Sequence, residues 1–76
     1  MTLDEAIPVI LDILGRFLNR KVEAAELEGN FETLGADSMD MVALAFELEK
    51  LSGRTLKPEM FLQHDTIKEA LRAHFK

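Results

Sequence analysis

The chain of 76 residues contains no cysteine, no tryptophan and no tyrosine. Without cysteine, neither a disulfide nor a thiolate metal site can stabilise the fold, and we expect a reducing, cytoplasmic setting. No apolar run approaches the ~20 residues of a membrane span. Asp4 and Glu5 stand where a signal peptide would carry cations. The length allows a single domain, which we place over residues 1–76.

Groups suited to catalysis are also scarce. The chain has two histidines, His64 and His74, and they lack the i, i+4 spacing of a helical metal pair. A domain this small has little room for a closed substrate pocket. We therefore expect neither catalysis by the chain itself nor a metal site, and we interpret both histidines as surface or packing residues.

The net charge of −5 argues against a nucleic-acid binder, which must neutralise phosphates, and against an anionic membrane surface. The charge is unevenly distributed along the chain. Residues 1–22 sum to zero, residues 23–49 contain eight acids and no base, and residues 50–76 sum to +3. The middle segment is therefore the part whose acids need an explanation.

The spacing of apolar residues predicts an all-α fold, a small bundle of three main helices plus one short helix. The first helix covers about residues 3–18 and opens with a capping box formed by Thr2 and Glu5. Pro8 predicts a disturbed start to this helix, because proline removes a backbone donor. Residues 19–37 lose the helical period, and apolar side chains within this connection are expected to tie it to the core.

The second helix covers about residues 37–52 and ends before Gly53. It carries two apolar stripes, so we expect one to pack inward and the other to be partly free for a partner. The inward stripe is Met41, Leu44, Ala45, Leu48 and Leu51, and the second is Met39, Val42, Ala43 and Phe46. A short helix begins at Pro58. The last helix follows a second capping box, formed by Thr66 and Glu69.

Residues 31–40, which read FETLGADSMD, join a glycine-bearing loop to the second helix. The simplest interpretation of Asp37 and Ser38 is a helix N-cap. That interpretation leaves unexplained the acidic segment and the spare apolar stripe. A hydroxyl at the start of a helix is exposed beside free backbone N–H groups, which makes Ser38 a suitable place to attach a phosphodiester.

The pattern Phe31-x-x-Leu34-Gly35-x-Asp37-Ser38-Met39 closely resembles the attachment motif of acyl carrier proteins and related peptidyl carriers. The resemblance covers nearly the whole chain in length, acidic balance and helix order. In that family the serine receives 4′-phosphopantetheine from coenzyme A through a phosphopantetheinyl transferase. The thiol of the arm then holds acyl or aminoacyl groups as thioesters. By this resemblance Ser38 is the modified residue, Asp37 is its motif neighbour, and the carrier itself is not an enzyme.

The resemblance also implies that the second helix docks on basic patches of partner enzymes, such as acyl-loading, condensing and transferase enzymes. Asp37 would help to steer such partners. The residues expected to contact them are Met39, Asp40, Val42, Phe46, Glu47 and Glu49. A solvated helix face accounts equally well for Glu47 and Glu49. A core position is the alternative for Val42 and Phe46.

Three positions depart from the familiar fatty-acid carriers: Ala43 and Lys50 replace acids, and Glu47 replaces a small residue. The C-terminal third looks more like the carriers of polyketide and nonribosomal peptide assembly lines. We therefore expect a freestanding, monomeric acyl carrier protein of specialised metabolism, for example polyketide biosynthesis.

Three other interpretations remain open. An aminoacyl or peptidyl carrier of the nonribosomal type would use the same motif. A non-catalytic helical interaction module would have Ser38 only as a helix cap. A hydrolase using Ser38 with His64 would need a triad and oxyanion donors that the sequence does not supply.

Overall fold

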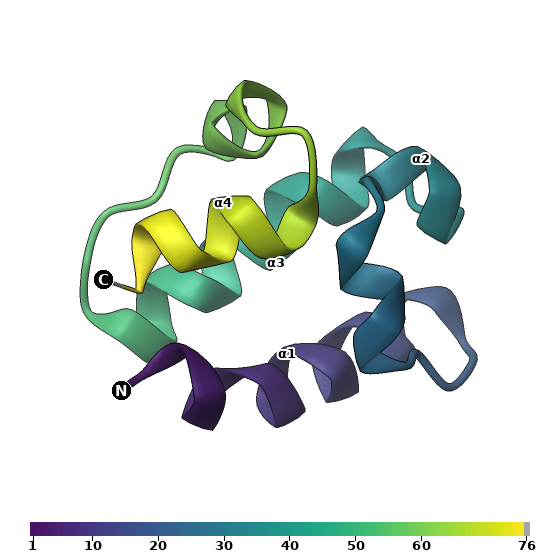
Figure 1. Ribbon diagram of the computed structural model, residues 1–76, viewed down its shortest axis with the longest axis horizontal. Helices are drawn as coiled ribbons and strands as arrows, with labels where there is room; N and C mark the ends of the chain where they lie inside the picture. The colour runs from purple at the N-terminus through teal and green to yellow at the C-terminus, as the bar shows by residue number, and fades with distance from the viewer. Residues whose placement is uncertain (76) are drawn as a thin grey trace.

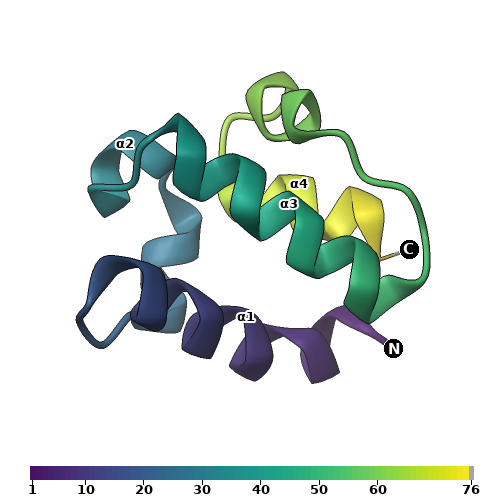
Figure 2. The same cartoon turned by 180° about the vertical axis from the view of Figure 1, so that it is seen from behind.

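In the computed structural model, which describes residues 1–75, three main helices pack around one apolar core. The elements in chain order are α1 (Leu3–Leu18), η1 (Ala24–Glu28), α2 (Phe31–Leu34), α3 (Ser38–Ser52), η2 (Pro58–Gln63) and α4 (Ile67–His74). Figures 1 and 2 view opposite sides and show α4 on one side, α3 on the other and α1 along the lower edge. The predicted all-α bundle is confirmed.

The start of α1 is regular, so the expectation of a disturbed first turn is wrong. The Glu5 backbone N–H donates to Thr2 Oγ1 at 3.2 Å, and the Thr2 N–H donates to Glu5 Oε1 at 2.8 Å. The second bond contributes to a lowered pKa of the Glu5 carboxyl. Pro8 lies inside the helix on its exposed side. Because Asp4, one turn earlier, is exposed as well, water can reach the carbonyl for which Pro8 offers no N–H.

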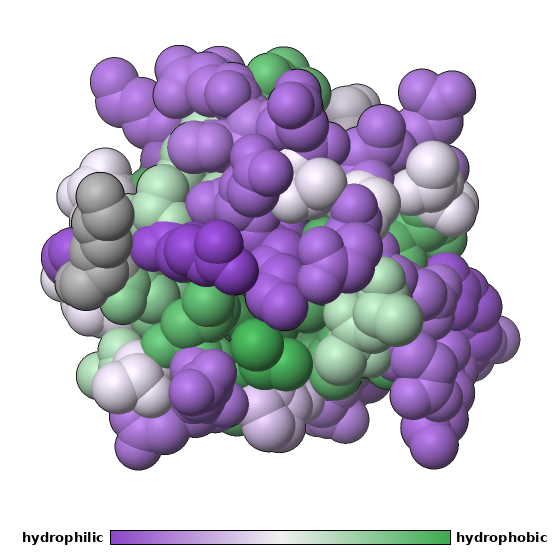
Figure 3. Space-filling model, in the orientation of Figure 1, coloured by the Kyte–Doolittle hydropathy of each residue, from purple (hydrophilic) through white to green (hydrophobic). Residues whose placement is uncertain are grey.

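The core draws on every main helix. Its largest fully buried side chains are Ile10, Leu14, Leu27, Leu44, Leu48, Ile67 and Leu71. Leu27 belongs to η1, which shows that the connection between α1 and α3 contributes to the core. Figure 3 shows the α4 side of the molecule, where hydrophilic residues surround a hydrophobic strip between α4 and α1.

The connection between α1 and α3 holds two short helices, η1 and α2, that the sequence pattern did not predict. Helices this short do not show a hydrophobic period, which is why the sequence pattern did not predict η1 and α2. Leu34 is buried, and the Phe31 ring packs edge-to-face on the Phe61 ring with centroids 5.0 Å apart. These contacts confirm that the connection is tied to the core.

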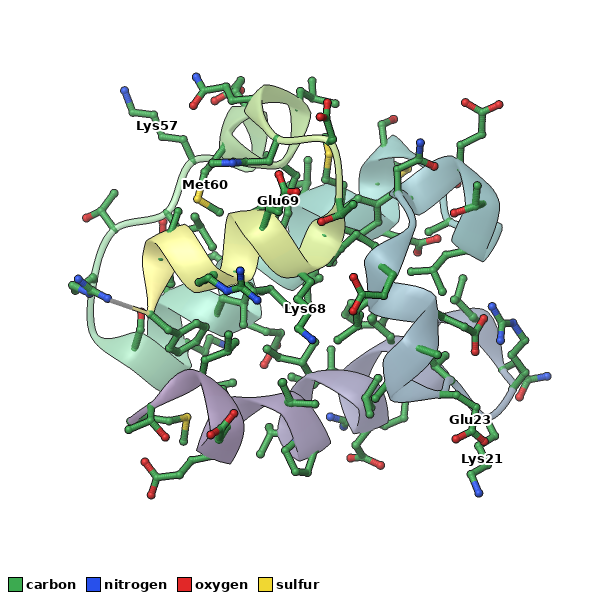
Figure 4. The ribbon with its side chains drawn as sticks, viewed as in Figure 1. Lys21, Glu23, Lys57, Met60, Lys68 and Glu69 are labelled. Atoms are coloured by element: carbon green, nitrogen blue, oxygen red, sulfur yellow. The ribbon has the colours of Figure 1, made fainter. Side chains whose placement is uncertain are left out.

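Two contacts hold the start of α4 against η1. The Ile67 backbone N–H donates to the Gly29 carbonyl at 2.9 Å, and Lys68 Nζ lies 3.2 Å from Glu28 Oε2. Figure 4 shows Lys68 reaching from α4 toward this part of the chain. Thr66 caps α4 by accepting the Glu69 N–H at 3.1 Å. The return bond of the predicted capping box is absent within residues 1–75, where the Glu69 side chain is exposed to solvent instead.

Among residues 1–75, no helix combines the length and apolar character needed to cross a membrane.

Candidate attachment site

The approach to Ser38 is set by the end of α2. Gly35 adopts a left-handed φ of 85°, which glycine reaches without the strain of a Cβ atom. Its N–H donates to the Glu32 carbonyl at 3.1 Å, and the Ala36 N–H donates to the Phe31 carbonyl at 2.9 Å. This pair of bonds is the Schellman pattern, which ends α2 and turns the chain into α3.

The cap of α3 is Asp37, and Ser38 is the first residue of the helix. The Asp40 N–H donates to Asp37 Oδ1 at 2.9 Å, and the Asp37 N–H donates to Asp40 Oδ2 at 3.2 Å. Within residues 1–75 the Ser38 hydroxyl forms no hydrogen bond, and the residue is exposed. Of the two residues that the sequence offers as the N-cap, Asp37 is confirmed and Ser38 is not, because the Asp37 carboxylate fills that position.

An apolar groove of about 630 Å³ begins at Ser38 and runs along α3. Its lining residues are Ser38, Met39, Val42, Ala43, Ala45, Phe46, Glu49, Leu56 and Pro58. One wall is the exposed side of α3, and the other comes from the segment that leads into η2. Among the lining residues within 1–75, Ser38 and Glu49 are the two with polar side chains.

The two stripes of α3 separate as expected. Leu44, Ala45 and Leu48 are buried. Met39 is 77% exposed, Val42 51% and Phe46 60%, so a core position for Val42 or Phe46 is wrong. These side chains are large apolar surface without a cover in the described chain, and their contact with a partner stays a prediction.

The acids of α3 differ in what they contact. Glu47 Oε1 lies 3.7 Å from Lys50 Nζ, and the same ammonium lies 4.8 Å from the centre of the Phe46 ring. Glu49 Oε1 accepts the Leu56 backbone N–H at 2.8 Å. Sequence reasoning missed this bond and the Leu56 wall, because nothing in the local pattern links two residues on opposite sides of a turn. The predicted roles of Asp40, Glu47 and Glu49 in partner binding remain predictions.

The histidines lie apart from Ser38. His74 is buried, and its Nε2 lies 2.7 Å from Ser52 Oγ, so a packing role is confirmed for this residue. Burial chiefly, helped by the Arg54 charge and opposed by Glu49, lowers the pKa of the His74 imidazole. His64 lines a separate depression between α2 and η2 and is absent from the groove that contains Ser38.

Among residues 1–75, no group of three or more histidine, cysteine, aspartate or glutamate side chains is placed to hold a metal ion. The arrangement around Ser38 is thus one exposed hydroxyl at a helix start, beside an apolar groove.

Comparison with known proteins identifies relatives of this chain. The family model described as "Phosphopantetheine attachment site" matches residues 8–73. A stretch of 43 residues is 42% identical to "Acyl carrier protein 2" of Ralstonia nicotianae and covers 57% of this chain and 53% of that protein. The match thus spans about half the length of this curated relative. No solved structure matches the chain.

Proposed function

Because the chain belongs to the phosphopantetheine attachment site family, we propose that Ser38 is the residue that carries the arm. The chain is a carrier protein whose cofactor is covalently attached 4′-phosphopantetheine. When bound, the cofactor supplies a terminal thiol that holds acyl groups as thioesters. The observation that carries the assignment is the exposed, unbonded Ser38 hydroxyl at the first residue of α3, within the matched region.

The start of α3 fits a phosphodiester in two respects. In the described chain, the N–H groups of Ser38 and Met39 take no part in a hydrogen bond, and α3 directs the positive end of its dipole at this point. The cap bonds of Asp37 and Asp40 hold the first turn in place without using the serine. The chain's own task is then to present a fixed backbone and a free hydroxyl, while the transferase supplies the catalysis.

The groove beside Ser38 supports an acyl cargo. Its apolar lining offers the arm and an attached hydrocarbon chain a surface away from water. We propose a monomeric acyl carrier, with the departures at Ala43, Glu47 and Lys50 favouring polyketide or other specialised metabolism over primary fatty-acid synthesis. An aminoacyl or peptidyl cargo is the alternative within the same family.

The partners follow from the carrier role. They are a phosphopantetheinyl transferase and enzymes that load, transfer or condense acyl groups. We propose that they dock on the exposed side of α3, where basic patches would meet Asp40, Glu47 and Glu49. Apolar patches of the same partners would cover Met39, Val42 and Phe46.

Intact mass after incubation with coenzyme A and a phosphopantetheinyl transferase tests the assignment. We expect the wild type and Ser52→Ala to gain the mass of one arm, and Ser38→Ala to gain none. Ser52 is a matched control because its hydroxyl is engaged with the Leu48 carbonyl at 2.8 Å. A mass gain in Ser38→Ala, or none in the wild type, would refute the proposal. Mass spectrometry of the natively expressed protein then identifies the cargo.

The rival function is a helical interaction module that uses the exposed Met39, Val42 and Phe46 stripe without any arm. It predicts an unmodified Ser38 in the native protein and partner binding that is unchanged in Ser38→Ala. The carrier role predicts the opposite native mass, so the same measurement separates the two functions.

A further inference from the structure

Glu49 occupies a different position from the other acids of α3. It lines the groove, whereas Glu47 lies beside Lys50 on the helix surface. Its Oε1 accepts the Leu56 backbone N–H at 2.8 Å in a partly buried setting. A charged acceptor in such a setting forms a strong bond, and its loss leaves the amide without a partner.

Leu56 is the residue through which this bond reaches the groove. Its side chain is 5% exposed and forms part of the wall opposite α3, together with Pro58. Lys57, between them, is exposed and points away from the bundle (Figure 4). The wall is therefore held by the burial of Leu56 and by the bond of its N–H group to Glu49.

We propose that Glu49 is a positioning residue, whose carboxylate fixes the Leu56 wall at the separation from α3 that receives the arm carried by Ser38. The inference rests on the proposed function of Ser38. It gives Glu49 a task within the carrier, in addition to its proposed contact with partners. The width of the groove then depends on the Glu49 side chain, which crosses from α3 to the opposite wall, together with the burial of Leu56.

Three substitutions separate the acceptor from the charge. Glu49→Gln keeps a carbonyl oxygen at the same reach and loses the charge. Glu49→Asp keeps the charge and withdraws the acceptor by one methylene group. Glu49→Ala removes both. A positioning role predicts that Glu49→Gln behaves like the wild type and that Glu49→Asp resembles Glu49→Ala.

The readout is an environment-sensitive dye on the thiol of the arm, loaded onto Ser38 from a coenzyme A analogue by the transferase. In the wild type and in Glu49→Gln, we expect the dye to emit at a shorter wavelength than the same dye on the free arm. In Glu49→Ala and Glu49→Asp, it should move at least half way to the free value. Exchange of the Leu56 amide hydrogen should accelerate about tenfold in the same two variants, as expected for loss of a bond to a charged group.

Glu59→Ala and Glu59→Gln are matched controls, because Glu59 is an exposed acid of η2 outside the groove. Both should load the dye and emit like the wild type. Should Glu49→Ala fail to fold, replacing the amide between Thr55 and Leu56 by an ester in a synthetic chain removes the same donor and keeps every side chain. The ester should produce the same shift in emission.

Three outcomes would each overturn the inference. The wild type emits at the same wavelength as the free arm; Glu49→Ala or the ester emits like the wild type; or Glu49→Gln shifts the emission as far as Glu49→Ala does. Failure of the proposed function looks different, because the arm would then not add to Ser38 at all. A loaded Glu49→Ala variant that emits like the wild type refutes the role of Glu49 and leaves the proposed function of Ser38 standing.

Discussion

Asp37 and Asp40 cap each other at the start of α3. The Asp40 N–H donates to the Asp37 carboxylate at 2.9 Å, and the Asp37 N–H donates to the Asp40 carboxylate at 3.2 Å. Ser38 lies between these two residues and takes no part in either bond. The pair therefore caps the helix without the serine, and the Ser38 hydroxyl stays available for modification.

This arrangement predicts different costs for neighbouring substitutions. Asp37→Ala should lower the free energy of unfolding by about 1 kcal/mol, because the cap acceptor is lost. Ser38→Ala should change it by less than about 0.5 kcal/mol, and Asp37→Asn should stay near the wild type because asparagine also caps. Urea denaturation of the unmodified proteins measures all three. Equal losses in Asp37→Ala and Ser38→Ala would contradict the assignment of the cap.

His74 predicts a dependence of stability on pH. Its lowered pKa means that the folded chain resists protonation, whereas the unfolded chain takes up a proton near the ordinary value of about 6.5. Stability contributed by neutral His74 is thus present above that value and decreases as the pH falls below it. Chemical denaturation between pH 8 and 6, above the range of most carboxyl groups, should show this slope in the wild type. His74→Gln should reduce the slope, and an unchanged slope would contradict the prediction.

We expect Arg20, just beyond the end of α1, to stabilise the fold. Its Nη2 donates to the Leu34 carbonyl at 2.9 Å and lies 2.8 Å from Glu26 Oε1. Arg20→Lys should destabilise the fold, because a single ammonium cannot reproduce the fork of the guanidinium. Arg16→Lys is the control, since within residues 1–75 Arg16 forms an exposed ion pair with Asp12 at 3.7 Å. Thermal unfolding that ranks the two variants equally would count against the Arg20 bridge.

The charges on α3 predict a salt-dependent association with partners. Glu47→Lys and the cap-preserving Asp40→Asn should slow association at low ionic strength, and the difference should shrink as salt screens the charges. Stopped-flow association with a transferase measures the rates. Glu69→Lys on α4 places the same reversal on the other side of the bundle and should have a smaller effect (Figures 1 and 2). Identical rates for all variants at low salt would refute the steering role.

The exposed stripe predicts an apolar anchor at the same interface. Phe46→Ser should leave the fold stable, because the ring is already largely exposed. It should weaken partner binding by about tenfold or more, chiefly through faster dissociation, as expected for an aromatic residue at the centre of an interface. Leu62→Ser, on the exposed side of η2, is the matched control. Surface plasmon resonance that finds equal effects for both variants would contradict the anchor.

The local parts of the fold could be predicted from sequence. Thr2 and Glu5 cap α1 as expected, Gly53 ends α3 with a left-handed φ of 72°, and Pro58 opens η2. Each of these signals acts within one or two helical turns. The second capping box was only half right. Thr66 accepts the Glu69 N–H, but within residues 1–75 the Glu69 side chain does not bond back to Thr66 and is exposed to solvent.

Other features depend on contacts that no short pattern records. The helices η1 and α2 are single turns, held by the burial of Leu27 and Leu34. The bond from Leu56 to Glu49 joins α3 to the segment beyond its end. Burial and partners at such positions depend on the packing of the whole chain.

By itself, the sequence determined the order of the main helices, because capping and hydrophobic period act over a few residues. It also pointed to Ser38, because the family motif is a short run of consecutive positions. Only the tertiary structure decided that Phe46 faces solvent and that Glu49 reaches across the groove. Those outcomes follow from how elements pack, since packing fixes which faces are covered and which polar groups meet. The chain contains no cysteine, so a carrier of this sequence obtains its thiol from the arm that we propose for the exposed Ser38.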